Sequence, residues 1–320
     1  MPVPTAGIHH VSSIAGDPQR NVDFYAGVLG LRLVKLTINF DDPGTYHLYY
    51  GNESGNPGSI LTYFPWGDEA QPGRIGIGQV AVTSLSIVPS AIAFWIGQLI
   101  ARGVKYEGPY RRFDDQVLGF ADPDGNQLEL IGHASAESRI GWAGGPVPVE
   151  SSIRGIHSVT LLEESLEPTE RILAGVLGFR PTQSDENRFR FEAAGDTANT
   201  VDVRASGGFW SGAMGRGAVH HVAFRAGDSA RQEATRAEAL SAGLDATQVL
   251  DRRYFTSVYF REPGGVLFES ATDGPGFTVD EPANDLGSSL KLPPWLERER
   301  ATIEQRLKPV HPPHRTRTQP

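Results

Sequence analysis

The chain contains no cysteine and only two methionines. The absence of thiolates excludes disulfide frameworks, iron–sulfur clusters, thiolate zinc sites and cysteine nucleophiles. Any metal ion must therefore be bound by histidine, aspartate or glutamate side chains.

Positive charge is also scarce. The 320 residues carry 29 Lys and Arg against 38 Asp and Glu, which gives a net charge of −9. Without a dense basic patch, binding to nucleic acid or to an anionic membrane surface is not expected. The composition favours a small molecule as the partner.

No apolar run is long enough to cross a bilayer. The most apolar stretch, residues 87–100, is interrupted by Pro89, Ser90 and Gln98, and a spanning helix needs about 20 apolar residues. The first residues have neither the basic nor the apolar region of a signal peptide. We therefore expect a cytoplasmic protein.

The sequence does contain an internal repeat. Four segments share the order of a short strand, an amphipathic helix and further strands that end near a glycine-rich turn. These βαβββ modules cover about residues 5–66, 73–133, 153–206 and 217–272. One module cannot bury both of its faces. We therefore expect an α+β fold in which modules pair into two curled cups of mixed sheet, with helices outside.

The repeat divides the chain into three parts. Residues 1–135 hold the N-terminal pair of modules, and residues 136–272 hold the C-terminal pair after a linker rich in Gly, Pro and Ser. Residues 273–320 form a C-terminal extension. Within it we expect a helix over residues 294–307 and a disordered end over residues 309–320.

Four histidines form two adjacent pairs at the same position of the first and fourth modules. The pairs are His9-His10 and His220-His221. Side chains in a strand alternate between the two faces of a sheet. Strict alternation places His221 on the concave face, with His10 and Ser12 facing the same interior. It places His9 and His220 on the opposite, helix-covered face.

A carboxylate supplies a third candidate ligand. Glu269 follows three apolar residues, and an unpaired buried carboxylate there would be unfavourable. The alternative is a solvent-exposed or ion-paired strand residue. Together with His10 and His221, Glu269 would bind a metal through three side chains and leave coordination positions open. That set favours Fe(II), with Mn(II) and Zn(II) as competitors.

The two middle modules lack the complete set. Module three has Ser158 where modules one and four have a histidine, and module two has Gln79. Module two does offer a carboxylate, Glu129. Only the pairing of modules one and four supplies two histidines and a carboxylate. We therefore expect the two ends of the chain to share one sheet.

The repeat, the histidine pairs and the Gly-Gly-Val-Leu-Phe-Glu ending resemble the vicinal oxygen chelate superfamily of glyoxalases, bleomycin-resistance proteins and extradiol dioxygenases. The closest resemblance is to its para-hydroquinone-type ring-cleaving dioxygenases. It covers nearly all of residues 5–285, including residues 7–10, 43–50, 57–60, 64–65 and 276–278. It implies His10, His221 and Glu269 as metal ligands, Fe(II) as cofactor, O₂ as co-substrate and a hydroquinone as the aromatic substrate.

The resemblance also assigns roles to residues around the metal. It implies catalytic roles for His9, His220, Arg252 and Tyr259, and substrate contacts for Ser12, Arg252 and Tyr259. A histidine with a pKa near neutrality would take or deliver a phenolic proton. Arg252 or Tyr259 would stabilise negative charge on the aromatic oxygens.

Each of these residues also has a structural interpretation. His9 and His220 would then hydrogen-bond to backbone carbonyls, Arg252 would pair with Asp251, and Tyr259 would fill space in a strand. His47 is expected to be an ordinary strand residue of module one.

Three functions compete. The first is an Fe(II) hydroquinone ring-cleaving dioxygenase. The second is a catechol extradiol dioxygenase, or a Zn(II)- or Ni(II)-dependent isomerase or lyase, within the same superfamily. The third is a metal-free protein that sequesters an aromatic compound. Ser158 argues against catechol cleavage, which places its ligands in modules three and four, and the complete ligand set argues against a pure binder. A homo-oligomer is left open.

Overall fold

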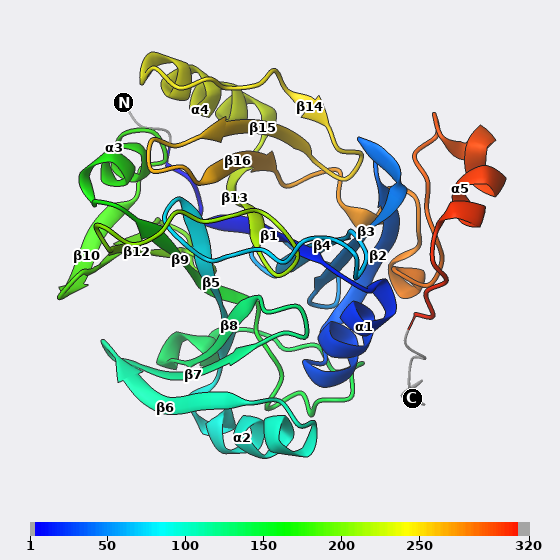
Figure 1. Ribbon diagram of the computed structural model, residues 1–320, viewed down its shortest axis with the longest axis horizontal. Helices are drawn as coiled ribbons and strands as arrows, with labels where there is room; N and C mark the ends of the chain where they lie inside the picture. The colour runs from blue at the N-terminus through cyan, green and yellow to red at the C-terminus, as the bar shows by residue number, and fades with distance from the viewer. Residues whose placement is uncertain (1–3, 313–320) are drawn as a thin grey trace.

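The protein is described by a computed structural model over residues 4–312, which fold into two eight-stranded mixed sheets (Figure 1). The first sheet has the order β14-β15-β16-β13-β1-β4-β3-β2. Its strands are β1 (Ile8–Ala15), β2 (Arg32–Asn39), β3 (Asp42–Gly51), β4 (Ile60–Pro65), β13 (Val219–Gly227), β14 (Leu250–Asp251), β15 (Thr256–Arg261) and β16 (Leu267–Thr272).

The second sheet has the order β10-β11-β12-β9-β5-β8-β7-β6. Its strands are β5 (Gln79–Ile87), β6 (Tyr106–Arg112), β7 (Asp115–Ala121), β8 (Gln127–Gly132), β9 (Ile156–Glu163), β10 (Arg180–Asp185), β11 (Arg188–Glu192) and β12 (Thr200–Ala205). The predicted α+β fold of two curled mixed sheets is confirmed.

The first sheet joins the two ends of the chain, as predicted. Strand β1 of module one pairs antiparallel with β13 of module four, and β5 pairs antiparallel with β9 in the second sheet. Each member of the β1–β13 pair has a parallel neighbour on its other side, β4 for β1 and β16 for β13. Side chains from the first and last modules therefore meet on one concave surface.

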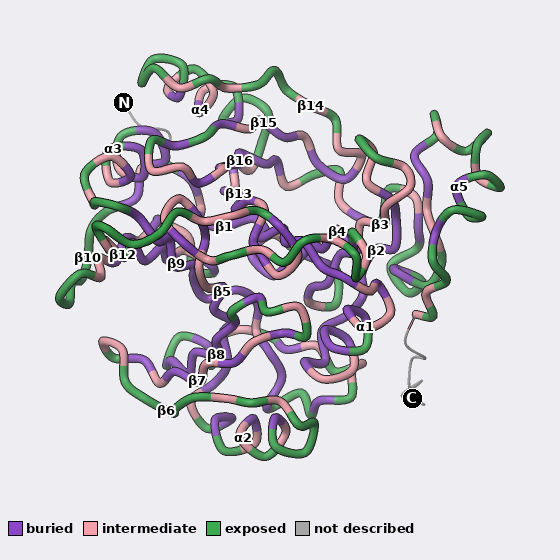
Figure 2. Tube along the Cα trace, in the orientation of Figure 1, coloured by how far each residue is buried: buried purple, intermediate pink, exposed green. Residues whose placement is uncertain are grey.

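Helices cover the outer faces of the sheets. They are α1 (Pro18–Val22), which continues into a π-helical turn (Asp23–Val28), α2 (Ile92–Ala101), α3 (Glu167–Gly175) and α4 (Ser229–Ser241). Asp17 caps α1, because its side chain accepts a hydrogen bond from the backbone N–H of Arg20 at 2.8 Å. Figure 2 shows buried residues along the central strands and exposed residues on outer strands such as β6 and β10.

The C-terminal extension packs against the first sheet (Figure 1). Its regular parts are short 3₁₀ turns at Phe277–Val279, Ala283–Asp285 and Glu297–Glu299, followed by α5 (Arg300–Arg306). The last turn and α5 fall within the predicted helix over residues 294–307. The predicted disordered end lies mostly on residues 313–320, outside the described residues. No helix in the described part of the chain is long and apolar enough to cross a membrane.

Candidate metal centre and aromatic cavity

Three side chains converge on the concave face of the first sheet: His10 from β1, His221 from β13 and Glu269 from β16. Their ligand atoms all lie within 4.8 Å of one another, and all three residues are buried. The Nε2 atoms of His10 and His221 are 3.3 Å apart. Oε2 of Glu269 lies 3.3 Å from the first nitrogen and 2.9 Å from the second. Within residues 4–312, no other trio of such side chains has this geometry.

Strand register explains this convergence. Ala223 of β13 pairs with His10 across one edge and with Glu269 across the other. His221 lies two residues before Ala223, on the same face of the sheet. The register of the three strands therefore places His10, His221 and Glu269 on the same face of the sheet, as the alternation of side chains predicted.

The chemistry of these atoms fits a divalent metal ion. Oε1 of Glu269 accepts a hydrogen bond from Ser257 at 2.6 Å, whereas the buried Oε2 accepts none from a described residue. Burial opposes ionisation, but positive charge and N–H donation from the His10 and His221 imidazoles hold the pKa of Glu269 well below its ordinary value, and a metal cation bound to neutral imidazoles would supply the same positive charge. Two imidazole nitrogens and one free carboxylate oxygen form a donor set for a first-row metal.

The adjacent histidines hold the ligand rings. Nδ1 of His9 lies 2.9 Å from Nδ1 of His10, and Nδ1 of His220 lies 2.7 Å from Nδ1 of His221. Burial, reinforced by the neighbouring imidazoles, lowers the pKa of His9 and of His220 to about 3. The His9 and His220 rings are therefore neutral at pH 7, and Nδ1 of each can accept a hydrogen bond from the Nδ1–H group of the adjacent ligand ring. In that case Nε2 of His10 and Nε2 of His221 each keep a lone pair for a metal ion.

Strict alternation is wrong at both histidine pairs. The β1–β13 register shifts between Ile8 and His10, and again between Ser12 and Ser13. His9 and His220 are the extra residues at these two β-bulges, which turn their side chains away from the alternating pattern. His220 therefore lines the cavity beside the metal trio instead of facing the helices. The expectation of a histidine pKa near neutrality is also not met at these positions.

A cavity of about 320 Å³ adjoins the trio. Much of its wall is apolar, with contributions from Phe40, Phe64, Trp66, Phe255 and Leu267. This volume and lining suit a single aromatic ring with a few polar substituents.

Arg252 and Tyr259 line the same cavity. The Arg252 guanidinium lies 5.5 Å from the centre of the Tyr259 ring, and that ring lies edge-on to His221 at 5.5 Å. Nη1 of Arg252 pairs with Asp41 at 2.9 Å, so its partner is not the sequence neighbour Asp251. Burial raises the pKa of Tyr259 above its ordinary value. The phenol is therefore a neutral hydrogen-bond donor.

Sequence reasoning missed part of the cavity wall. His47 and Tyr49 line the cavity beside Ser12, which the resemblance had already named as a substrate contact. His47 hydrogen-bonds to Tyr49 and to Thr62 at 2.9 Å each. The sequence does show His47 and Tyr49 on one face of a strand. It does not show that Thr62, from another strand, is their partner.

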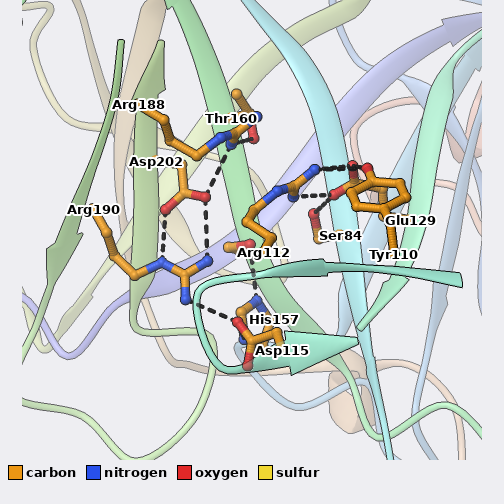
Figure 3. A network of polar contacts seen from close by, with 11 residues as sticks. Ser84, Tyr110, Arg112, Asp115, Glu129, His157, Thr160, Arg188, Arg190 and Asp202 are labelled. Atoms are coloured by element: carbon orange, nitrogen blue, oxygen red, sulfur yellow. Dashed lines mark hydrogen bonds and ion pairs between the residues drawn. The ribbon is translucent and has the colours of Figure 1, made fainter. Parts of the chain in front are cut away.

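The second sheet carries a network of buried ion pairs (Figure 3). Glu129 of β8 accepts hydrogen bonds from both terminal nitrogens of Arg112, at 2.6 and 2.7 Å. Asp202 of β12 is bound by Arg188 and Arg190. Guanidinium partners already neutralise these buried carboxylates. Glu129, the carboxylate of module two, is therefore an ion-paired residue in this structure.

The sequence profile of the Glyoxalase/Bleomycin resistance protein/Dioxygenase superfamily matches residues 7–130 and 155–270. The chain belongs to this superfamily. A member of Bacillus subtilis (strain 168), MhqO, named as a candidate ring-cleaving dioxygenase, is 45% identical over 308 residues, which cover 95% of this chain and 96% of the relative. The chlorohydroquinone/hydroquinone 1,2-dioxygenase of Sphingobium indicum is 35% identical over 307 residues, which cover 93% of this chain and 94% of the relative.

Solved structures agree with this assignment to the superfamily. A crystal structure from Bacillus subtilis superposes with a TM-score of 0.93 at 44% identity, covering 97% of this chain and 99% of that one. Glyoxalase I from Zea mays has a TM-score of 0.61 at 18% identity, over 83% of this chain and 92% of that one. At this low identity, the likeness shows a shared fold alone. The relatives at 35–45% identity support a ring-cleaving dioxygenase as the general activity.

Proposed function

We propose that this protein is an Fe(II)-dependent dioxygenase that opens the ring of a hydroquinone with O₂. The observation that carries this proposal is the buried cluster of two histidine Nε2 atoms and one carboxylate oxygen beside an aromatic-lined cavity. Two histidines and a carboxylate with open positions are typical of non-heme Fe(II) oxygenases. The name of the Sphingobium relative supports hydroquinones as the substrate class.

His10, His221 and Glu269 would hold the metal ion. When bound, the ion supplies a Lewis acid for a phenolic oxygen and the site at which O₂ reacts. The protein keeps the ligands oriented: His9 and His220 accept from the Nδ1 atoms of the two ligand rings, and Ser257 donates to Glu269. Burial of all three ligands limits the access of bulk water to their donor atoms.

Polar groups in the cavity wall would orient the substrate. With Nε2 of His221 bound to a metal, Nδ1–H of His221 would donate to Nδ1 of the neutral His220. The proton of His220 would then reside on Nε2, and this N–H can donate to a ring oxygen. Tyr259 can donate an O–H, and the Arg252 cation favours negative charge on the aromatic oxygens. In this arrangement His9 and His220 orient the two ligand rings, and His220, which lines the cavity, donates to the substrate and does not remove the phenolic proton.

Glutamine substitutions in the two sheets test the proposal. We expect Glu269→Gln to lose iron and O₂ uptake, because it removes the anionic ligand; His221→Ala should do the same. The matched control Glu129→Gln should keep both, because Glu129 binds Arg112 in the second sheet. The measurements are the iron content of anaerobically prepared, Fe(II)-reconstituted protein and O₂ uptake with hydroquinone and with catechol.

Several outcomes would contradict the proposal. Iron that survives Glu269→Gln but not Glu129→Gln would place the metal in the second sheet. O₂ uptake with catechol alone would overturn the hydroquinone assignment while leaving the metal site. Wild-type protein that binds aromatic compounds without metal or O₂ uptake would be a sequestering protein.

A further inference from the structure

Four side chains form a continuous hydrogen-bonded relay in the cavity wall. Oη of Tyr49 lies 2.9 Å from Nδ1 of His47, Nε2 of His47 lies 2.9 Å from Oγ1 of Thr62, and Oγ1 of Thr62 lies 2.7 Å from Oγ of Ser12. Ser12, His47 and Tyr49 line the cavity. Thr62 is completely buried, as is Ser12, but it does not line the cavity. Thr62 is therefore the link that joins two ends facing the same cavity.

The relay is built into the sheet. Its members come from the neighbouring strands β1, β4 and β3, and Thr62 is the register partner of both Ser12 and Tyr49. The His47 ring stacks between Phe64 and Tyr49, with centroid distances of 4.1 Å to each and interplanar angles of 32° and 34°. Both nitrogens of His47 are engaged, so the ring cannot turn without losing two hydrogen bonds.

The relay can be polarised in only two ways. Burial, together with the His10 and His221 imidazoles, holds the pKa of His47 well below its ordinary value, and a neutral imidazole donates from one nitrogen and accepts at the other. If Tyr49 donates to His47, the sequence of bonds ends with a free O–H on Ser12. If Ser12 donates to Thr62, it ends with a free O–H on Tyr49. One end always offers a donor and the other a lone pair.

On the basis of the hydroquinone activity proposed above, we infer that this relay binds the substrate hydroxyl remote from the metal trio, and that His47 and Thr62 are positioning residues that orient the hydroxyls of Ser12 and Tyr49. Ser12 lies two residues beyond His10 on the same face of β1, which is about 7 Å along the strand. A para-diol carries its second oxygen at the far end of the ring, where a hydroxyl can both donate and accept. Catechol carries both oxygens side by side near the trio. The relay therefore selects para-diols.

Substitutions at Thr62 test the relay without changing any side chain that lines the cavity. Thr62→Val keeps the shape and breaks the relay, whereas Thr62→Ser retains the hydroxyl. The affinities of Fe(II)-loaded protein for hydroquinone, catechol and phenol are measured by anaerobic calorimetry. We expect Thr62→Val to weaken hydroquinone binding about 5- to 10-fold, the range of one or two hydrogen bonds. Phenol and catechol, which lack the remote hydroxyl, should bind as in the wild type, and Thr62→Ser should restore hydroquinone binding.

A buried threonine of the second sheet provides the matched control. Thr83→Val, in β5, should leave all three affinities unchanged. Tyr49→Phe breaks the relay at its other end and serves as the second variant if Thr62→Val does not fold. Unchanged hydroquinone binding in these variants, or an equal loss for phenol, would overturn the inference. Wild-type protein without hydroquinone-dependent O₂ uptake would instead refute the proposed function, so the two failures are distinguishable.

Discussion

Arg252 carries the one guanidinium among the described residues that line the cavity. It lies over the Tyr259 ring, and its ion pair with Asp41 reaches a carboxylate side chain that is 71% exposed. An ion pair with a solvent-exposed partner contributes little free energy. Asp41 also lines the cavity, but because its side chain is largely exposed, the charge of Arg252 remains available to a bound aromatic oxygen.

Two substitutions separate the charge of Arg252 from its ion pair. We expect Arg252→Gln to lower kcat/KM for hydroquinone about 100-fold, as the loss of one preorganised electrostatic contact typically does. Asp41→Asn should lower kcat/KM by less than about 3-fold, because it removes only a solvent-exposed partner of Arg252. O₂-uptake kinetics of both variants provide the measurement. Equal losses of kcat/KM in the two variants would show that turnover depends on the Arg252–Asp41 ion pair and not on the charge of Arg252 alone.

The β1 and β13 strands show how far sequence reasoning reaches. The residue pattern predicts His10, His221 and Glu269 on one face, because alternation and the repeat are local properties. It does not predict the bulges at His9 and His220, because a bulge depends on the register between two strands far apart in sequence. The same limit hides the relay through Thr62.

The C-terminal extension is attached to β2 through a buried lysine, which the sequence pattern did not indicate. Lys35 is fully buried, and its Nζ lies 2.7 Å from Asp280 and 2.6 Å from Glu281 of the extension. Phe277, a few residues earlier, packs edge-on against Tyr49 of the cavity wall at 5.1 Å. The extension therefore supports the outer side of the substrate cavity.

Removal of the Lys35 charge should weaken this attachment. We expect Lys35→Met to lower the free energy of unfolding by about 3 kcal/mol, because it leaves the buried Glu281 carboxylate without its principal partner. The control Lys291→Met should change it by less than about 1 kcal/mol, since that amine is 3.8 Å from Glu281 and partly exposed. Urea unfolding measures both. Glu281→Gln should recover part of the loss in the Lys35→Met background, and no recovery would argue against the charge-pair explanation.

The two sheets meet at a pair of buried carboxyl groups. Glu163 ends β9 of the second sheet, and Glu262 follows β15 of the first. Glu262 accepts hydrogen bonds from Thr169 and from two backbone N–H groups. Neither carboxyl oxygen of Glu163 has a hydrogen-bond partner among the described residues. Burial, and then the charge of Glu262, raises the pKa of Glu163 to about 9.

This raised pKa makes the stability of the whole molecule depend on pH. A glutamate in the unfolded chain has a pKa of about 4.3. Between that value and the raised pKa, Glu163 keeps its proton in the folded chain and loses it in the unfolded chain. Glu163 should therefore lower the free energy of unfolding by about 1.4 kcal/mol for each pH unit from about 5 to 9, and cause no further change above that range. Glu163→Gln, which cannot ionise, should remove this slope.

Denaturant unfolding at pH 5.5, 7.0 and 8.5 compares Glu163→Gln with the wild type. Groups that do not interact with Glu163 titrate equally in the two proteins, so the difference between them isolates Glu163 and its coupling to Glu262. We expect the variant to gain stability relative to the wild type as pH rises, with the largest gain at pH 8.5. The exposed neighbour Glu164 provides the control, because Glu164→Gln should follow the wild-type curve. Parallel curves for Glu163→Gln and the wild type would mean that Glu163 ionises with an ordinary pKa in the folded protein, and that the junction between the sheets tolerates its charge.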